Sequence, residues 1–108
     1  MGSTKLIRYL NDRFRSTFQG GQVVLTRGIR ALPQEEITEI LSKVSNFNDF
    51  NSDNDPYFEH DGAAFEYNNM KIIWKIDYYD KEYEYASDDP ADITKTNRVL
   101  TVMLADEY

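Results

Sequence analysis

The stretch AAFEYNNMKIIWKIDYYD, residues 63–80, predicts a β-hairpin and so determines the class of fold. Two strand-like runs meet at Asn68 and Asn69, and asparagine tolerates the positive φ angles of a tight turn. Alternate side chains of a strand point to opposite faces. One face of the second run consists of Met70, Ile72, Trp74, Ile76 and Tyr78. The opposite face consists of Lys71, Ile73, Lys75, Asp77 and Tyr79. The more apolar face is expected to pack on a core that contains Trp74.

Two amphipathic helices are predicted before this hairpin. In the first, apolar residues recur every three or four positions, which is the period of a helix face. These residues are Leu6, Ile7, Leu10, Phe14 and Phe18. Thr4 is a candidate N-cap, and the pair Gly20–Gly21 is expected to end the helix. The second helix begins at Pro33, because proline suits a first helical turn. Its apolar stripe consists of Ile37, Ile40, Leu41, Val44 and Phe47.

Two further strands complete the predicted sheet. QVVLTRGIR, from Gln22 to about Arg30, is rich in β-branched residues near its start. RVLTVMLADEY, residues 98–108, begins with a run that is largely apolar on both faces, which favours a central strand over an edge strand. A chain of 108 residues has the size of one domain. We therefore expect a single α+β domain over residues 1–108, in which two helices pack on an antiparallel sheet of about four strands.

Composition restricts the compartment and the chemistry. The chain has no cysteine, which excludes disulfides, thiolate metal sites and a thiol nucleophile. No apolar run approaches the ~20 residues of a membrane span, and the first residues lack the pattern of a secretory signal. We therefore expect a soluble, cytoplasmic protein with no cofactor and no membrane partner.

Charge is distributed unevenly along the chain. Residues 1–47 carry seven Lys or Arg against four acids, whereas residues 48–92 carry three Lys against thirteen acids. The acidic middle would repel phosphates, so direct nucleic-acid binding is not expected there. A basic protein surface or a metal cation is the expected partner.

NDPYFEHD, residues 54–61, contains the only histidine, His60, in a loop rich in Asp and Asn. Carboxylates with one imidazole suit Mg²⁺, Mn²⁺ or non-haem iron, and His60 could act as a general base oriented by Glu59 or Asp61. The spacing matches no EF-hand, and an iron facial triad would need a second histidine. Three interpretations stay open: a structural loop with turn-forming acids, a protein-binding surface, or a small metal-dependent hydrolase. The residues of that hydrolase site would be Asp55, Glu59, His60 and Asp61.

Two acidic segments follow. DYYDKEYEY, residues 77–85, alternates acids and tyrosines, so an extended strand would display Asp80, Glu82 and Glu84 on one face. Tyrosines beside charges are common at protein interfaces, although an ordinary solvated strand face has the same pattern. SDDPAD, residues 87–92, predicts a solvated loop with one short helical turn after Asp88.

Several segments together resemble a family of small bacterial proteins that is classified only as a domain of unknown function. The segments are LNDRFR, GGQVVLTRGIRALP, NDPYFEHD, WKIDYYD, SDDPAD and RVLTVMLADEY. The resemblance runs from about Leu6 to Tyr108. Members of this family occur in proteobacterial chromosomes, plasmids and phages, and usually have NDP-x-GEHDFG where this chain has Phe58 in place of the first glycine and Gly62 in place of the phenylalanine. The resemblance implies a mobile genetic element, where small acidic proteins often antagonise host defence.

We therefore expect a small, acidic, non-enzymatic binding protein that docks carboxylates on a basic protein surface. The resemblance implies that the target is a nuclease or an RNA-guided complex of host defence, which would make the chain an inhibitor of the anti-CRISPR or anti-restriction type. Two alternatives stay open: the metal-dependent hydrolase, and a plasmid accessory protein that forms a homodimer through an exposed strand. The residues expected to contact the partner are Asp53, Asp55, Glu59, Asp61, Tyr79, Asp80, Glu82, Tyr83, Glu84, Tyr85, Asp88 and Asp89.

Overall fold

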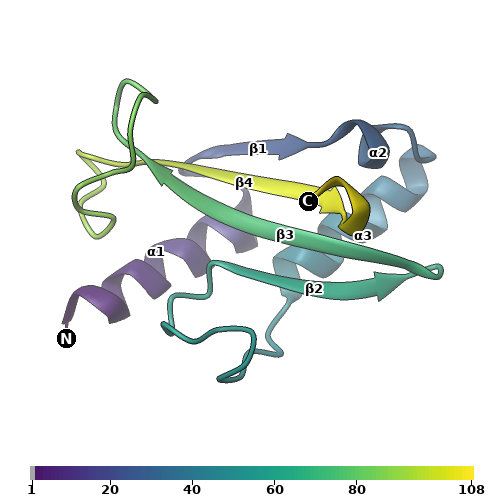
Figure 1. Cartoon of the computed structure of the whole chain (residues 1–108), viewed down its shortest axis with the longest axis horizontal. Helices are drawn as coiled ribbons and strands as arrows, with labels where there is room; N and C mark the ends of the chain where they lie inside the picture. Colours follow the sequence, from purple (N-terminus) through teal and green to yellow (C-terminus); the bar gives the residue numbers. More distant parts are fainter. Residues whose placement is uncertain (1) are drawn as a thin grey trace.

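The computed structural model describes residues 2–108 and confirms an α+β fold. The helices are α1 (Gly2–Thr17), α2 (Arg27–Arg30), α3 (Gln34–Asn46) and the short 3₁₀ helix η1 (Ala105–Glu107). The strands are β1 (Gln22–Leu25), β2 (Gly62–Tyr67), β3 (Met70–Tyr79) and β4 (Asn97–Leu104). α1 and α3 cover one face of the sheet, and the opposite face, with η1 in front of it, is turned toward the viewer in Figure 1. None of the helices within residues 2–108 has the length and apolar character that crossing a bilayer requires.

β3 and β4 form the interior of the sheet, whose strand order is β1-β4-β3-β2. β3 runs antiparallel to both neighbours, with Trp74 opposite Ala63 of β2 and Val102 of β4. β1 runs parallel to β4, so the sheet is mixed. The expected antiparallel pairing is therefore confirmed for three strands and wrong for β1. Two helices and the hairpin separate β1 from β4 in the chain, so no tight turn dictates their relative direction.

The β2–β3 hairpin forms as predicted. Asn68 and Asn69 have φ angles of 48° and 65°, and Tyr67 is paired with Met70. Two central residues at positive φ belong to a type I′ turn, whose twist matches that of the paired strands. β2 has a neighbour on one side only, so homodimer formation through this edge stays a prediction.

The core lies between the sheet and the two long helices. Its most deeply buried members are Phe14, Ile29, Ile40, Val44, Ile72, Trp74, Leu100 and Val102. The predicted stripe of α3 is confirmed, since three of its residues are buried and the other two pack against the core. α1 begins at Gly2, so Thr4 is not its N-cap. It ends at Thr17, because Phe18 turns to a φ of 58° before the glycine pair is reached.

The segment after β1 is a helical turn, which corrects the strand predicted from Gln22 to Arg30. α2 follows Thr26, and its Ile29 has no exposed surface. Glu107 near the C-terminus accepts hydrogen bonds from Thr26 Oγ1 (2.6 Å) and from the Gly28 N–H (2.7 Å). A Cβ at position 28 would lie 2.6 Å from Leu104 Cδ1 and 2.8 Å from the Glu107 carboxylate, so any larger residue would have to displace these side chains. Contacts with the C-terminal segment therefore override the local strand pattern.

Two predictions about the segments after β3 are wrong. β3 ends at Tyr79, and the chain turns back instead of continuing as a strand. The Asp80 N–H donates to the Tyr85 carbonyl at 2.8 Å, which closes this turn. After Asp88 the chain makes hydrogen-bonded turns, not a helix, and the Asp92 N–H donates to the Asp89 carbonyl at 2.9 Å.

Candidate functional site

Arg15 of α1 is a buried cation that joins both long helices to the sheet. Its Nη1 donates to the carbonyls of Val44 (2.7 Å) and Phe47 (2.9 Å) at the C-terminal end of α3. Such carbonyls lack partners within the helix, and a cation there also interacts favourably with the helix dipole. The guanidinium carbon lies 4.8 Å from the centre of the Trp74 ring, and Nη2 donates to Asp12 at 3.1 Å. Burial lowers the pKa of Arg15, and Asp12 acts in the opposite direction.

His60 has a carboxylate on each side of its ring. Nδ1 lies 2.9 Å from Asp12 Oδ1, and Nε2 lies 3.6 Å from Asp55 Oδ2. The imidazole is stacked on Phe50, with ring centres 3.8 Å apart and planes inclined by 5°. A general base needs a nitrogen that can reach a proton of the substrate. Both nitrogens of His60 face carboxylates, one from α1 and one from the loop before β2. The residue therefore connects these two segments.

Asp55 forms the inner side of this loop and is only 3% exposed. Its Oδ1 accepts hydrogen bonds from the backbone N–H groups of Glu59 and His60, both at 3.1 Å. These bonds hold a backbone in which Phe58 and His60 have positive φ angles of 60° and 55°, which are uncommon for residues other than glycine. Asp55 is thus a structural residue, and its carboxylate is not available to the partner that the sequence analysis assigned to it.

The hydrolase interpretation requires His60 and several acids to converge on one point. Within residues 2–108, no group of three or more His, Cys, Asp or Glu side chains is arranged to hold a metal ion. The imidazole lies between Asp12 and Asp55, and Glu59 accepts a hydrogen bond from the Tyr78 hydroxyl at 2.7 Å. In this part of the described chain, these groups bond to one another or to Tyr78 and do not form an open ligand set.

A second buried network connects α1, β3 and β4 through Asn11. The Asn11 amide donates to the Tyr78 hydroxyl at 2.7 Å and to the Glu59 carbonyl at 3.0 Å, and its oxygen accepts from Arg98 Nε at 2.7 Å. Burial raises the pKa of Tyr78, and the hydrogen bond to Glu59 raises it further. Neither Asn11 nor Arg98 was predicted as a site residue. The sequence did contain a signal for Asn11, because this polar residue lies four positions after Ile7 and therefore on the apolar side of the predicted helix.

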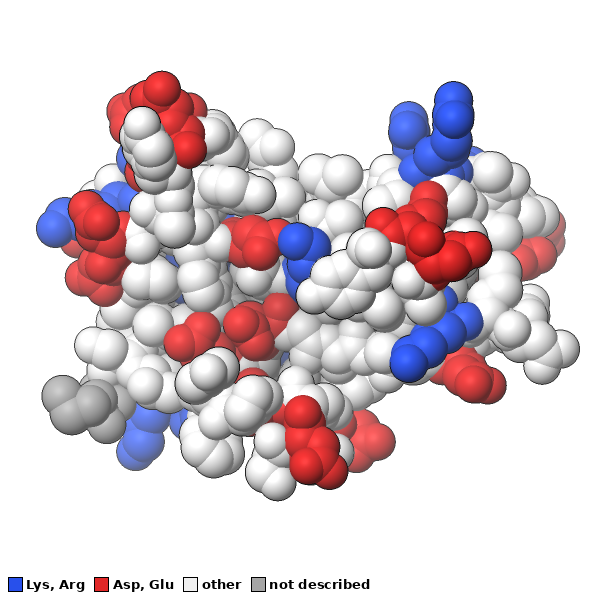
Figure 2. Space-filling model, viewed as in Figure 1, with Lys and Arg blue, Asp and Glu red and all other residues white. Residues whose placement is uncertain are grey.

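Seven acids lie on the strands and loops at one end of the sheet, whereas others, such as Asp49, Glu66 and Asp106, are exposed elsewhere. This end is here called the acidic end, and its acids are Asp61, Asp77, Asp80, Glu82, Glu84, Asp88 and Asp89. Tyr79 at the end of β3 is paired with Asn97 at the start of β4, so the intervening segment returns to its starting point. Asp80, Glu82 and Asp88 line one depression of about 330 Å³, together with Lys81 and Lys95. In Figure 2, carboxylates occupy the projecting loop at the upper left, the left margin and the middle of this face, and others lie at the right and along the lower edge.

The turn after β3 presents tyrosines beside these acids. Asp80 Oδ1 accepts the N–H of Glu84 at 2.9 Å, so the acids of this turn do not form a row on a strand. Tyr83 and Tyr85 are 45% and 74% exposed. Tyr79 is partly buried, and its ring centre lies 6.0 Å from that of Tyr83. The predicted contact tyrosines therefore lie at the acidic end, two of them on a turn.

A second depression, of about 390 Å³, is lined by Asp61, Ile76, Asp77, Tyr78, Tyr79 and Ala86. Burial raises the pKa of Asp61, and the neighbouring acids Glu59, Asp55 and Asp77 raise it further. Lys75 Nζ already pairs with Asp77 at 2.7 Å, and a further positive group beside Asp61 would relieve the remaining repulsion between the carboxylates. The sequence analysis left Asp77 out of the site, although strand alternation placed it on the face opposite the core.

The other predicted contact residues differ in their exposure. Asp53 is exposed on the loop between α3 and β2, and Asp88 and Asp89 are exposed on the loop before β4. Glu59 is partly buried, and its carboxylate is bonded to Tyr78. The structure thus brings most of the predicted acids together and withdraws Asp55 and, in part, Glu59 from the surface.

Comparison with known proteins supplies a family. Residues 25–107, from the last residue of β1 to the end of η1, match the model of a family described as protein of unknown function (DUF3768). The chain belongs to the DUF3768 family. No curated protein matches it, and neither does a solved structure. The DUF3768 match is shorter than the resemblance expected from Leu6, and it leaves out α1, which supplies Asp12 and Arg15.

Replacing Arg15 of this DUF3768 protein by methionine removes the cation and keeps much of the side-chain volume. We expect the free energy of unfolding to fall by about 3 kcal/mol, because the carbonyls of α3 and the Asp12 carboxylate lose their partner. Urea denaturation measures this change. The control is Arg13→Met on the exposed side of α1, which is expected to change stability by less than about 0.5 kcal/mol. Equal effects of the two substitutions would contradict the role assigned to Arg15.

The connection that His60 makes between Asp12 and Asp55 is tested by His60→Asn. Asparagine tolerates a positive φ but does not span Asp12 and Asp55. We expect a loss of about 1–2 kcal/mol, seen as a fall in the thermal midpoint of roughly 4–8 °C per kcal/mol. Asp53→Asn in the same loop should leave the midpoint unchanged. If His60→Asn also left it unchanged and abolished an activity, His60 would be a catalytic residue.

Asp61→Asn tests the crowding of acids in the DUF3768 protein. Folding raises the pKa of Asp61, so its contribution to stability is present at low pH and is lost as pH rises through the folded-state pKa. The variant should therefore be more stable than the parent at neutral pH, and this advantage should vanish below the ordinary aspartate pKa of about 3.9. Thermal midpoints measured across this range check it, with Asp53→Asn as the exposed control. A variant less stable at neutral pH would show that the ionised carboxylate supports the fold.

Proposed function

We propose that this DUF3768 protein is a non-enzymatic binding protein whose acidic end docks on a basic protein surface. The observation that carries the proposal is the convergence of carboxylates with the exposed Tyr83 and Tyr85 at one end of the sheet. Dense carboxylates attract a basic partner and increase its rate of association. Exposed tyrosines supply contact area together with a polar tip, which is common at protein interfaces.

The raised pKa of Asp61 supports the binding of a cationic group. In the free protein, burial and the neighbouring acids oppose the ionisation of this carboxylate. A lysine or arginine that entered the depression beside Asp77 would favour the ionised form. Carboxylates kept at a cost to stability are typical of positions that serve function.

The target that we propose is the nucleic-acid-binding surface of a host-defence nuclease or RNA-guided complex. Such surfaces are basic because they bind phosphates, and a protein that occupies one excludes the nucleic acid. The resemblance to proteins of mobile genetic elements motivates this choice and makes the chain an inhibitor of the anti-CRISPR or anti-restriction type. Duplex DNA has one charge per about 1.7 Å of its axis, so imitating it requires several segments to supply carboxylates together. The two depressions draw their acids from several segments, namely the residue just before β2, β3 itself and the loops before β4, which supports such imitation.

A pull-down from the native host tests the proposal with the parent protein and two variants of equal net charge. The acidic-end variant is Glu82→Lys/Glu84→Lys/Asp88→Lys, and the matched control is Asp49→Lys/Glu66→Lys/Asp106→Lys; all six positions are exposed. Asp80 is left intact because its carboxylate organises the turn. We expect the parent and the control to retain a basic nucleic-acid-binding protein, and the acidic-end variant to bind it roughly 100-fold more weakly.

Two further measurements make this result specific. Added nucleic acid should compete with the DUF3768 protein for the captured partner, and the affinity should fall as salt rises from about 50 to 200 mM. Equal losses in the two charge-reversed variants would mean that only net charge matters. An affinity indifferent to salt would contradict docking through carboxylates.

A further inference from the structure

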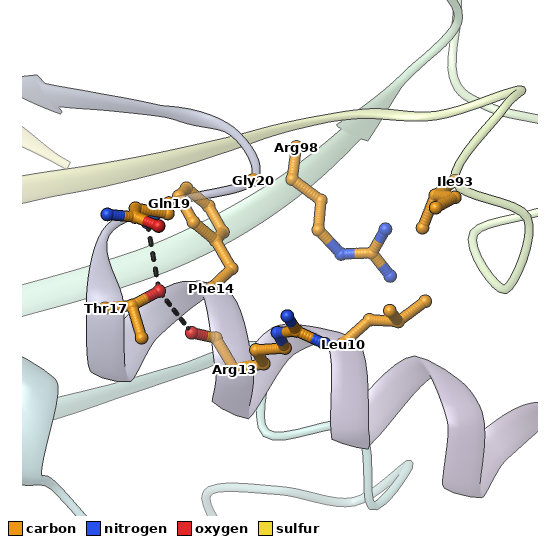
Figure 3. A pocket seen from close by; sticks show the side chains of 8 residues that line it. All are labelled: Leu10, Arg13, Phe14, Thr17, Gln19, Gly20, Ile93 and Arg98. Atoms are coloured by element: carbon orange, nitrogen blue, oxygen red, sulfur yellow. Dashed lines mark hydrogen bonds between the residues drawn. The ribbon is translucent and has the colours of Figure 1, made fainter.

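A pocket of about 430 Å³ opens between α1 and the segment that leads into β4 (Figure 3). Arg13 and Arg98 supply its charged groups, and Leu10, Phe14 and Ile93 supply its apolar wall. We propose that this pocket binds a small anion, namely a phosphate or carboxylate group carried on an apolar body. The site uses none of the carboxylates of the acidic end, so it is independent of the proposed docking function.

Arg98 is a buried cation without a carboxylate partner. It is 3% exposed, and it belongs to none of the ion pairs formed within residues 2–108. Nε donates to Asn11 Oδ1 at 2.7 Å and Nη2 donates to the Pro90 carbonyl at 2.6 Å, whereas Nη1 has no protein acceptor in the described chain. Arginine stays charged in proteins, and a buried charge is normally paired. The pocket therefore contains a fixed guanidinium with a free donor.

Arg13 adds a second guanidinium from α1. Figure 3 shows Arg13 on the helix side of the pocket, and Arg98 extending from β4 toward Ile93. The Arg13 side chain is exposed and forms no hydrogen bond or ion pair within residues 2–108. Two cations on one concave surface favour an anion between them. The planar fork of a guanidinium matches the oxygens of phosphate and carboxylate groups.

The remaining wall suits an apolar body. Ile93 is 62% exposed and offers an apolar surface beside the two arginines. The Thr17 hydroxyl already donates to the Arg13 carbonyl (2.8 Å) and accepts from the Gln19 N–H (3.1 Å). The polar groups left for a ligand are the two arginines and the Gln19 side-chain amide, and of these only the arginines carry the charge that an anion requires. The volume lies within the range of about 300–1,000 Å³ that is usual for small-molecule sites.

The orientation of Arg98 is set before any ligand arrives. Asn11 holds Arg98 Nε and is itself bonded to Tyr78, and the Arg98 guanidinium carbon lies 5.2 Å from the centre of the Tyr78 ring. A donor that is already oriented loses little conformational freedom on binding, which favours affinity. A purely structural Arg98, which only ties Pro90 to α1, would make the same protein contacts without binding an anion.

Phenyl phosphate, benzoate and benzyl alcohol are the probes, titrated into the whole chain and followed by the NMR shifts of amide and arginine Nε–H groups. We expect saturable shifts at Gln19, Gly20 and Ile93 with phenyl phosphate or benzoate, and much weaker binding of the neutral benzyl alcohol. Comparing the two anions identifies the oxyanion that fits. Inorganic phosphate should bind about tenfold more weakly than the better aromatic anion, because it leaves the apolar wall uncovered.

Arg13→Gln separates binding from folding, because the Arg13 side chain makes no hydrogen bond or ion pair that the described fold uses. It should weaken the binding of the aromatic anion about tenfold or more, and Lys5→Gln on the same helix should leave it unchanged. Three results would overturn the proposal: no saturable shift up to on the order of 10 mM, benzyl alcohol bound as tightly as benzoate, or equal effects of Arg13→Gln and Lys5→Gln.

Discussion

The buried charge of Arg15 needs partners inside the protein, and the contacts that supply them connect both long helices to the sheet. Its partners come from different elements: the carbonyls that end α3, the Asp12 carboxylate of α1 and the Trp74 ring of β3. A buried cation that lost one of these partners would be strongly destabilising. Arg15 Nε already lacks a partner, which makes the remaining contacts more important. Asp12 extends the network to His60, so the loop before β2 is positioned by the same charge.

This arrangement divides the carboxylates of an acidic chain into two groups. Asp12, Asp55 and Glu59 form hydrogen bonds in the interior or at its margin, and there they hold the chain in place. At the acidic end, Asp77 is paired with Lys75 and Asp80 organises its turn, whereas Glu82, Glu84, Asp88 and Asp89 are exposed and can meet a partner. On the helix side of the sheet, Arg13 and Arg98 form a cationic pocket. Opposite charges thus occur on distinct surfaces of one small domain.

Local pattern was sufficient where a few neighbouring residues decide the structure. The Asn68–Asn69 turn, the buried side of β3 and the stripe of α3 all follow from spacing and turn chemistry, and all are confirmed. The pattern failed where a distant contact decides. α2 replaces the end of the predicted strand because Glu107 binds Thr26 and the Gly28 N–H from near the other end of the chain. The turn after Tyr79 has a local cause instead, since the Asp80 carboxylate accepts the Glu84 N–H four residues later and competes with the extended strand.

The amino-acid sequence by itself determined the α+β class, the central position of β4, and the concentration of acids in residues 48–92, because these depend on composition and on periods of two or 3.6 residues. Only the tertiary structure decided which acids are interior and which are surface groups. His60 meets Asp12 across 48 positions of the chain, and Arg98 meets Asn11 across 87. Such contacts have no local signature, because they arise when α1 packs on the sheet and encloses polar groups that must then bond to one another.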